Sequence, residues 1–197
     1  MMMRWWKQFK IKRLLKQLKI LSTARLNNTT ATDAVQKEIA LYFELAGLYE
    51  SMIGTKKQPF AREQALACYR AAAALDSADA QFLVGKQSLE EGRMREELQA
   101  SGFLASEANT AYLKMCFHDA HGFLLAAEKH LHIKAKRLRG LCYINGWGVP
   151  IDKNAGFDLV VASIEQENAW DRVQKIFAEL GINQSSFFSE LFQHRKK

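Results

Sequence analysis

The sequence predicts an all-α protein in which helices pack in successive pairs. Only two prolines occur in 197 residues, and no segment shows the apolar–polar alternation of a half-buried strand. A hydrophobic fraction of 48% and a charged fraction of 25% are ordinary for a globular protein. A short alanine-rich pattern also recurs along the chain, which is typical of helical repeats whose hairpins cannot bury their apolar faces alone.

Three copies of the recurring pattern can be aligned at the alanines Ala80, Ala135 and Ala169. Residues 68–74, 123–129 and 157–163 lie at matching distances before these anchors, and an earlier copy surrounds residues 45–49. The anchors, counted from Ala40, are 40, 55 and 34 residues apart. The long middle interval predicts an insertion near residues 93–119, which we expect either to carry specificity or to be a surface extension without a role.

Glycines follow the anchors at similar distances. Gly85 and Gly140 occupy matching positions, where the lack of a side chain lets two helices approach closely. Gly92 and Gly146 come next and predict helix ends. We therefore expect Gly140→Val to destabilise the protein by forcing a helix pair apart.

The segment from Leu138 to Asp152 carries the clearest signal, a helix that ends in a glycine turn. Gly146 suits left-handed torsions, Pro150 prevents the first helix from continuing, and Asp152 is placed to cap the next one. The segment resembles the Sel-one-like repeats, a branch of the tetratricopeptide superfamily. The resemblance rests on Ala135, Leu138, Gly140, Tyr143, Gly146, Gly148, Val149, Asp152 and Ala155.

This resemblance implies an α/α solenoid of about three helix-pair repeats, which acts as a non-enzymatic protein–protein interaction scaffold or adaptor. A partner segment would dock on the concave face lined by the first helix of each pair, and Gln81, Lys136 and Arg139 are predicted as exposed contacts. Lys136→Glu combined with Arg139→Glu is expected to abolish partner binding without lowering stability. We place the arm and linker at 1–32, the repeats at 33–183, and a C-terminal cap and basic tail at 184–197. The predicted core of the cap is Phe187, Phe188, Leu191 and Phe192.

The N-terminal arm holds the basic character of the chain. Eight of 28 basic residues precede the first acid, Asp33, which leaves 20 basic against 21 acidic residues in the rest. A nearly neutral body argues against nucleic acid as a partner. Residues 1–21 also lack the uninterrupted apolar stretch of a signal peptide, and no segment approaches a membrane span.

The arm is predicted to form an amphipathic helix with leucines on one face. One interpretation is a helix that binds an anionic membrane surface, which would make the protein peripheral at the inner face of a membrane. The other is that the leucines pack on the first repeat and the lysines are solvated. The residues predicted to meet a membrane or a partner are Trp5, Trp6, Phe9, Lys10, Lys12, Arg13, Lys16 and Lys19.

Residues for catalysis or metal binding form no recognisable pattern. His118 and His121 are three apart, but no second pair of ligands lies near them in the sequence. The glycine turn lacks the strand and lysine of a phosphate-binding loop. Three scattered cysteines argue against a disulfide framework and favour the cytoplasm. We therefore predict no enzyme activity, metal or cofactor.

Overall fold

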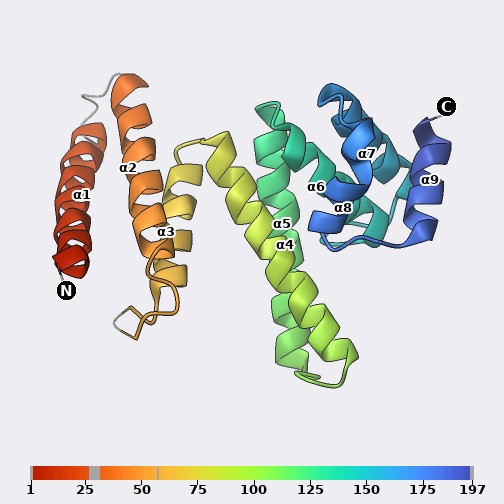
Figure 1. The fold of residues 1–197 in the computed structure, drawn as a ribbon, viewed down its shortest axis with the longest axis horizontal. Coiled ribbons are helices and arrows are strands. Elements are labelled where there is room, and N and C mark those ends of the chain that lie inside the picture. The colour runs from red at the N-terminus through yellow and green to blue at the C-terminus, as the bar shows by residue number, and fades with distance from the viewer. Residues whose placement is uncertain (1, 27–31, 57, 196–197) are drawn as a thin grey trace. The chain divides into compact units, whose positions relative to one another are not determined.

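The structure, a computed structural model, describes residues 2–26, 32–56 and 58–195 (Figure 1). Regular structure in these ranges is helical throughout, which confirms the predicted all-α class. The side chains of residues 2–5 and 26 and the predicted linker at 27–31 lie outside the described part. Contacts divide the chain into two units, Met1–Val84 and Gly85–Lys197. This division differs from the predicted boundaries after residues 32 and 183, and it falls inside a helix.

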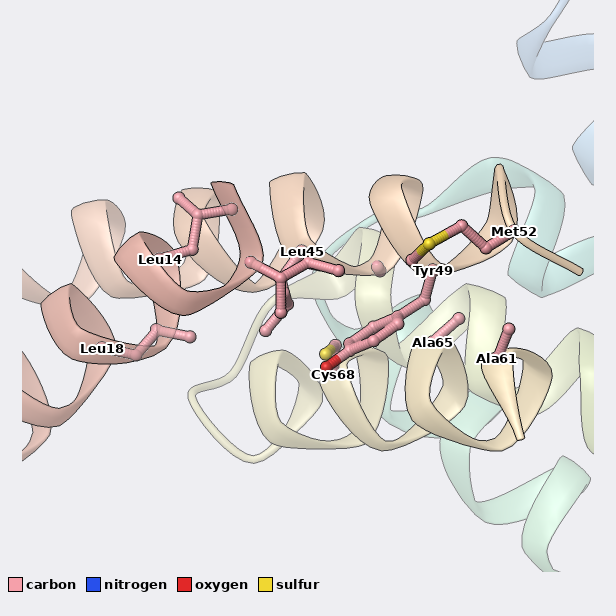
Figure 2. Close-up of a cluster of buried hydrophobic side chains, with 10 residues drawn as sticks. Leu14, Leu18, Leu45, Tyr49, Met52, Ala61, Ala65 and Cys68 are labelled. Carbon is pink, nitrogen blue, oxygen red and sulfur yellow. The ribbon is translucent and has the colours of Figure 1, made fainter. Parts of the chain in front are cut away.

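Unit 1 contains α1 (Met2–Leu26), α2 (Thr32–Glu50), α3 (Ala61–Ala73) and the first residues of α4 (Ala78–Ala100). Both α1 and α3 pack on α2. Figure 2 shows side chains of the three helices meeting in one apolar cluster. The buried members of this cluster are Ile11, Leu14, Leu18, Leu45, Ala46, Tyr49, Met52, Ala61, Ala65 and Cys68.

The N-terminal helix is therefore part of a packed core. Ile11, Leu14 and Leu18 recur at helical spacing and are 3–6% exposed. Ion pairs hold α1 on α2 as well: Lys10 Nζ lies 2.6 Å from Glu44 Oε1, and Arg25 Nε lies 3.0 Å from Glu38 Oε2. Of the two interpretations of the arm, the structure agrees with packing of the leucine face on the first repeat.

Unit 2 contains the rest of α4 and the helices that follow it. These are α5 (Glu107–Lys129), α6 (Ile133–Asn145), α7 (Lys153–Gln166), the 3-10 turn η1 (Trp170–Arg172), α8 (Val173–Glu179) and α9 (Ser185–Arg195). Helix α6 packs on both α5 and α7, and α9 packs on α7. Phe157, Phe177 and Leu191 are at most 1% exposed and form the centre of this packing.

The predicted insertion is an elongation of one helix hairpin. The prediction that a helix ends at Gly92 is wrong, because α4 continues through this residue to Ala100. The end of the predicted insertion and the recurring segment 123–129 lie on one continuous helix, α5. Ser106 caps α5 by accepting a hydrogen bond from the Asn109 backbone N–H at 3.1 Å. An interior glycine costs a helix only about 1 kcal/mol, and at Gly92 an added Cβ would lie 2.6 Å from the Phe117 ring.

Glycines also mark close approaches between helices in unit 2. A Cβ added at Gly140 would lie 2.7 Å from the Gly156 carbonyl oxygen on α7. A Cβ added at Gly85 would lie 3.1 Å from the Leu124 backbone nitrogen on α5. Two helix backbones can come this near only where one of them carries no side chain.

The C-terminal cap is mostly as predicted. Leu191 is buried, and the Phe187 ring contacts those of Phe157 and Phe177 at centroid distances of 5.5 and 4.9 Å. The expectation that Phe192 lies in the core is wrong: this ring is 38% exposed and contacts Trp170 at the surface. Phe192 follows Leu191 directly, so it points about 100° away from the buried face of α9.

Candidate functional site

The predicted partner contact Gln81 is not exposed. It is only 5% accessible, and its amide nitrogen donates to Asp76 Oδ1 at 3.0 Å. The side chain therefore connects the start of α4 to the turn that precedes it within unit 1. The expected exposure is wrong, because a sequence pattern does not show that an amide has a nearby backbone turn to bind.

Lys136 and Arg139 lie on α6 in unit 2, and both have intramolecular partners. Lys136 Nζ donates to Gln166 Oε1 at 3.0 Å. The guanidinium of Arg139 forms an ion pair with Glu128 of α5, and both side chains are about 15% exposed. Arg139 also lies 5.7 Å from the centre of the Tyr143 ring. A glutamate at 139 would place two carboxylates together. The double substitution stays a prediction for binding, but this contact argues that it would also lower stability.

The glycine turn after α6 forms part of a surface with α4 and α5. Gly146 ends α6 with a φ of 75°, and the Trp147 backbone N–H donates to the Cys142 carbonyl at 2.9 Å. Gly148 also has a φ of 75°, and a Cβ there would overlap the Phe117 backbone of α5. Asp152 Oδ1 then accepts from the Ala155 N–H at 3.0 Å and begins α7. These contacts hold the turn in a fixed place on α5.

Trp147 is the central side chain of this surface. Its ring stacks on Phe117, with a centroid distance of 5.8 Å and an interplanar angle of 17°. Its indole N–H donates to Glu96 Oε2 at 3.2 Å, and the Arg93 guanidinium lies 5.3 Å from the ring centre. Arg93 itself donates to the Leu180 carbonyl oxygen at 2.8 Å. A tryptophan fixed by a stack, a hydrogen bond and a cation is a preorganised contact for a ligand.

Two hollows flank Trp147. The first has a volume of about 320 Å³ and is bordered by α4, the turn and α9; its charged members are Arg93, Glu96, Glu97, Lys153 and Glu190. The second, of about 460 Å³, is bordered by α5 and the turn; its members include Leu113, Lys114, Phe117, His118, Asn145 and Val149. Sequence reasoning missed this site because it used Trp147 only as part of a turn. The available signal was an aromatic residue enclosed by two turn glycines.

The mixed charge of the first hollow suits a polar segment rather than a single ion. Lys153 Nζ lies 3.3 Å from Glu190 Oε2, and both side chains are at least 40% exposed. Glu97 on α4 is also exposed. Exposed pairs of this kind contribute little to stability, so they can exchange partners when a ligand arrives.

The histidines and cysteines of unit 2 form no reactive group in the described residues. Burial lowers the pKa of His121, whose ring lies edge-on to Tyr143 at 5.6 Å. Burial also raises the pKa of the Cys142 thiol to about 12, which keeps it protonated. Within the described ranges, no three His, Cys, Asp or Glu residues lie together in a way that could hold a metal.

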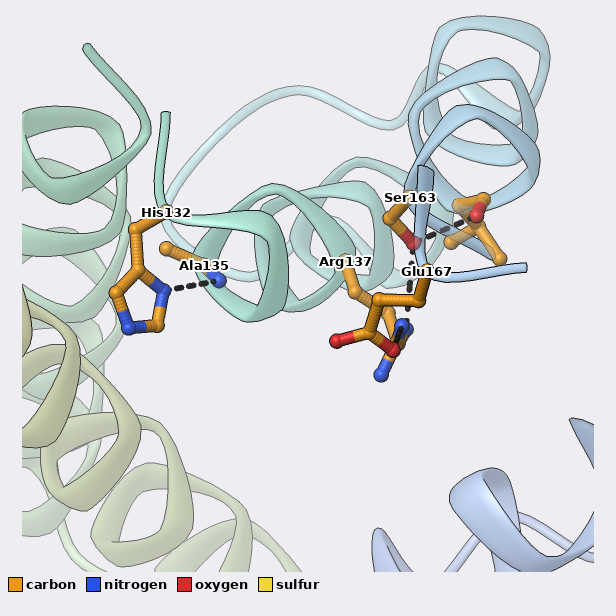
Figure 3. A network of polar contacts seen from close by, with 6 residues as sticks. His132, Ala135, Arg137, Ser163 and Glu167 are labelled. Carbon is orange, nitrogen blue, oxygen red and sulfur yellow. Dashed lines mark hydrogen bonds and ion pairs between the residues drawn. The ribbon is translucent and has the colours of Figure 1, made fainter. Parts of the chain in front are cut away.

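A buried polar network joins α6 to the end of α7 in unit 2 (Figure 3). Arg137 Nε donates to Ser163 Oγ at 3.2 Å, and its guanidinium pairs with Glu167. At the start of α6, His132 Nδ1 accepts from the Ala135 backbone N–H at 3.1 Å. Arg137 is 6% exposed, so the network acts on the stability of the helix pair and not on a ligand.

No model of a known protein family matches this chain, and no curated protein matches it either. Among solved structures, the chain is similar to a Sel1 repeat protein from Oxalobacter formigenes. The identity is 22%, and the likeness covers 78% of this chain and 69% of that chain, with a TM-score of 0.27. This neighbour is of the repeat class that the motif at 135–155 resembles.

Proposed function

We propose that this protein is a non-enzymatic interaction scaffold of the cytoplasm that binds a segment of another protein at the Trp147 surface. The observation that carries the proposal is the fixed indole ring between two hollows of unit 2. Tryptophan and arginine supply much of the binding energy where protein surfaces meet, particularly when neighbouring contacts exclude water. Arg93 and Trp147 provide that combination within a helical framework.

Affinity capture from native lysate tests this function with a pair of exposed residues. Glu97→Lys combined with Lys153→Glu reverses the charge on two sides of the first hollow and leaves the net charge unchanged. The control, Glu165→Lys with Lys175→Glu, makes the same exchange at exposed positions of α7 and α8. We expect the first variant to lose a partner that the wild type and the control retain. Equal recovery of that partner by all three proteins would refute the proposal.

Lys136 stays a proposed contact of the same partner, because its bond to Gln166 is exposed and easily exchanged. Lys136→Glu is expected to weaken capture without lowering stability. Gln81 and Arg139 are less suited to this role, since both are committed to neighbours within their own units.

A second candidate function is recruitment to anionic membrane through α1. Trp6 and Phe9 are 52% and 55% exposed on this basic helix, which is the chemistry of an interfacial anchor. No helix in the described part of the chain is both long and apolar enough to cross a bilayer. Co-sedimentation with phosphatidylserine vesicles tests the idea: Trp6→Ser with Phe9→Ser should abolish binding, and binding that persists in this variant would contradict it.

A further inference from the structure

A separate hollow opens on unit 1, where α1 and α3 both pack on α2. Its volume is about 340 Å³. Figure 2 shows Leu18, Leu45 and Cys68, one from each helix, around the same apolar region. The floor comes from α2, and the walls come from α1 and α3. The α1 wall includes Leu15, Lys19 and Ser22, and the α3 wall is formed by Gln64, Ala67 and Cys68. We call this hollow the α1–α3 groove.

The groove is largely apolar inside, and its α3 wall combines Gln64 with the small residues Ala67 and Cys68. Leu15 on α1 is 46% exposed, although leucine gains free energy when it is removed from water. On α3 the exposed Ala67 offers no bulk that would keep another helix at a distance. The Oε1 atom of Gln64 is buried and has no hydrogen-bond partner, so the wall also holds an acceptor that a ligand donor would satisfy.

The α1 side of the groove is uniformly positive. Lys12, Leu15, Lys19 and Ser22 are spaced three or four residues apart, so they share one stripe of the helix. Lys12, Lys16 and Lys19 are exposed, and none of them takes part in an ion pair within the described residues. The helix contains no acidic residue that could neutralise them. These lysines are therefore available to carboxylates of a ligand above the groove.

We infer that the α1–α3 groove binds an amphipathic helix of a protein partner, with acidic residues along the edge that faces α1. Leu15 to Ser22 spans about two helical turns, or roughly 10 Å, which matches a ligand helix with apolar anchors at i, i+3 or i+4, and i+7. The inference deepens the scaffold function proposed above and rests on it, but it concerns unit 1 and a different surface.

Isothermal titration calorimetry with two synthetic helical peptides tests the inference on the full-length protein. Both peptides carry the same leucine stripe; one has glutamates beside it and the other has lysines. We expect the glutamate peptide to bind at least about tenfold more tightly. Leu15→Asp should weaken that binding at least about tenfold, and Lys12→Glu with Lys19→Glu should reverse the preference. Lys37→Glu, at an exposed position of α2, is the control and should change nothing.

Several results would overturn the inference. Failure of the glutamate peptide to bind, or equal binding to Leu15→Asp, would show that the groove is not its site. Self-association of the wild type that Leu15→Asp abolishes would make a second copy the occupant. If phosphatidylserine vesicles displaced the glutamate peptide from the wild type, and bound less well to Leu15→Asp, the occupant would be a membrane. The Glu97 and Lys153 exchange should leave peptide binding unchanged, so capture by unit 2 can succeed or fail independently of the groove.

Discussion

Gly140→Ala is expected to destabilise the protein although alanine is the better helix former. The added Cβ would lie 2.7 Å from the Gly156 carbonyl oxygen and 2.8 Å from Val160 Cγ2. A backbone carbonyl cannot rotate away as a side chain can, so α6 and α7 would have to separate. Overpacking of this kind costs about 1–3 kcal/mol.

Gly122→Ala in α5 is the matched control, because nothing lies within 4 Å of a Cβ added there. Both substitutions gain about 1 kcal/mol of helix propensity, and both lie in unit 2. The difference between their free energies of unfolding therefore isolates the contact with α7. We expect Gly140→Ala to be the less stable by about 1–3 kcal/mol.

Thermal unfolding followed by far-UV circular dichroism measures this difference. For a chain of this size, 1 kcal/mol shifts Tm by roughly 2–4 °C, so the two variants should be clearly separated. Gly140→Val adds two further methyl groups and should unfold at a still lower temperature. Equal melting of Gly140→Ala and Gly122→Ala would refute the close packing of α6 on α7.

Three further predictions concern unit 2. Glu167→Ala should lower the free energy of unfolding by about 3 kcal/mol in urea titration, because it leaves the buried Arg137 without its carboxylate; a loss near zero would contradict the pairing. Burial lowers the pKa of His121 below its ordinary 6.5. The unfolded chain therefore binds a proton at this residue before the folded protein does, so the free energy of unfolding falls as the pH drops below 6.5. His121→Gln should flatten the fall in stability as the pH drops below 6.5, by at most about 1.4 kcal/mol per pH unit, and an unchanged pH profile would contradict this prediction. Gly148→Ala should melt lower than Gly102→Ala, because both have positive φ but only Gly148 contacts a neighbouring backbone; equal Tm values would argue otherwise.

Local signals in the sequence were enough to predict the turn between α6 and α7. Gly146 adopts a left-handed conformation and Asp152 caps the next helix, and both follow from torsions and hydrogen bonds within a few residues. The prediction of a helix end at Gly92 was wrong, because this glycine makes room for the Phe117 ring of another helix. Glycine can end a helix, and it can also allow two helices to pack closely. The spacing of glycines in the sequence does not distinguish these two roles.

The candidate sites were less predictable, since they depend on contacts between distant residues. The sequence pattern predicted an exposed Arg139, because it did not show that Glu128 of the preceding helix lies beside it. The leucines of α1 were recognisable as one face, but the sequence did not say whether α2 or a membrane would cover them. Trp147 became a candidate only when α4 and α9 were seen to border it.

The elongated hairpin of α4 and α5 bears on how relatives of this chain can be found. The two helices have 23 residues each, whereas α6 and α7 have 13 and 14, so both arms of the hairpin are extended by similar amounts. Matched extension keeps the two ends of the hairpin level, and it increases the number of residues between the anchors Ala80 and Ala135. A search that assumes a constant repeat length loses its register at this hairpin. Alignment helix by helix, with the interval left free, is the more suitable way to trace its ancestry.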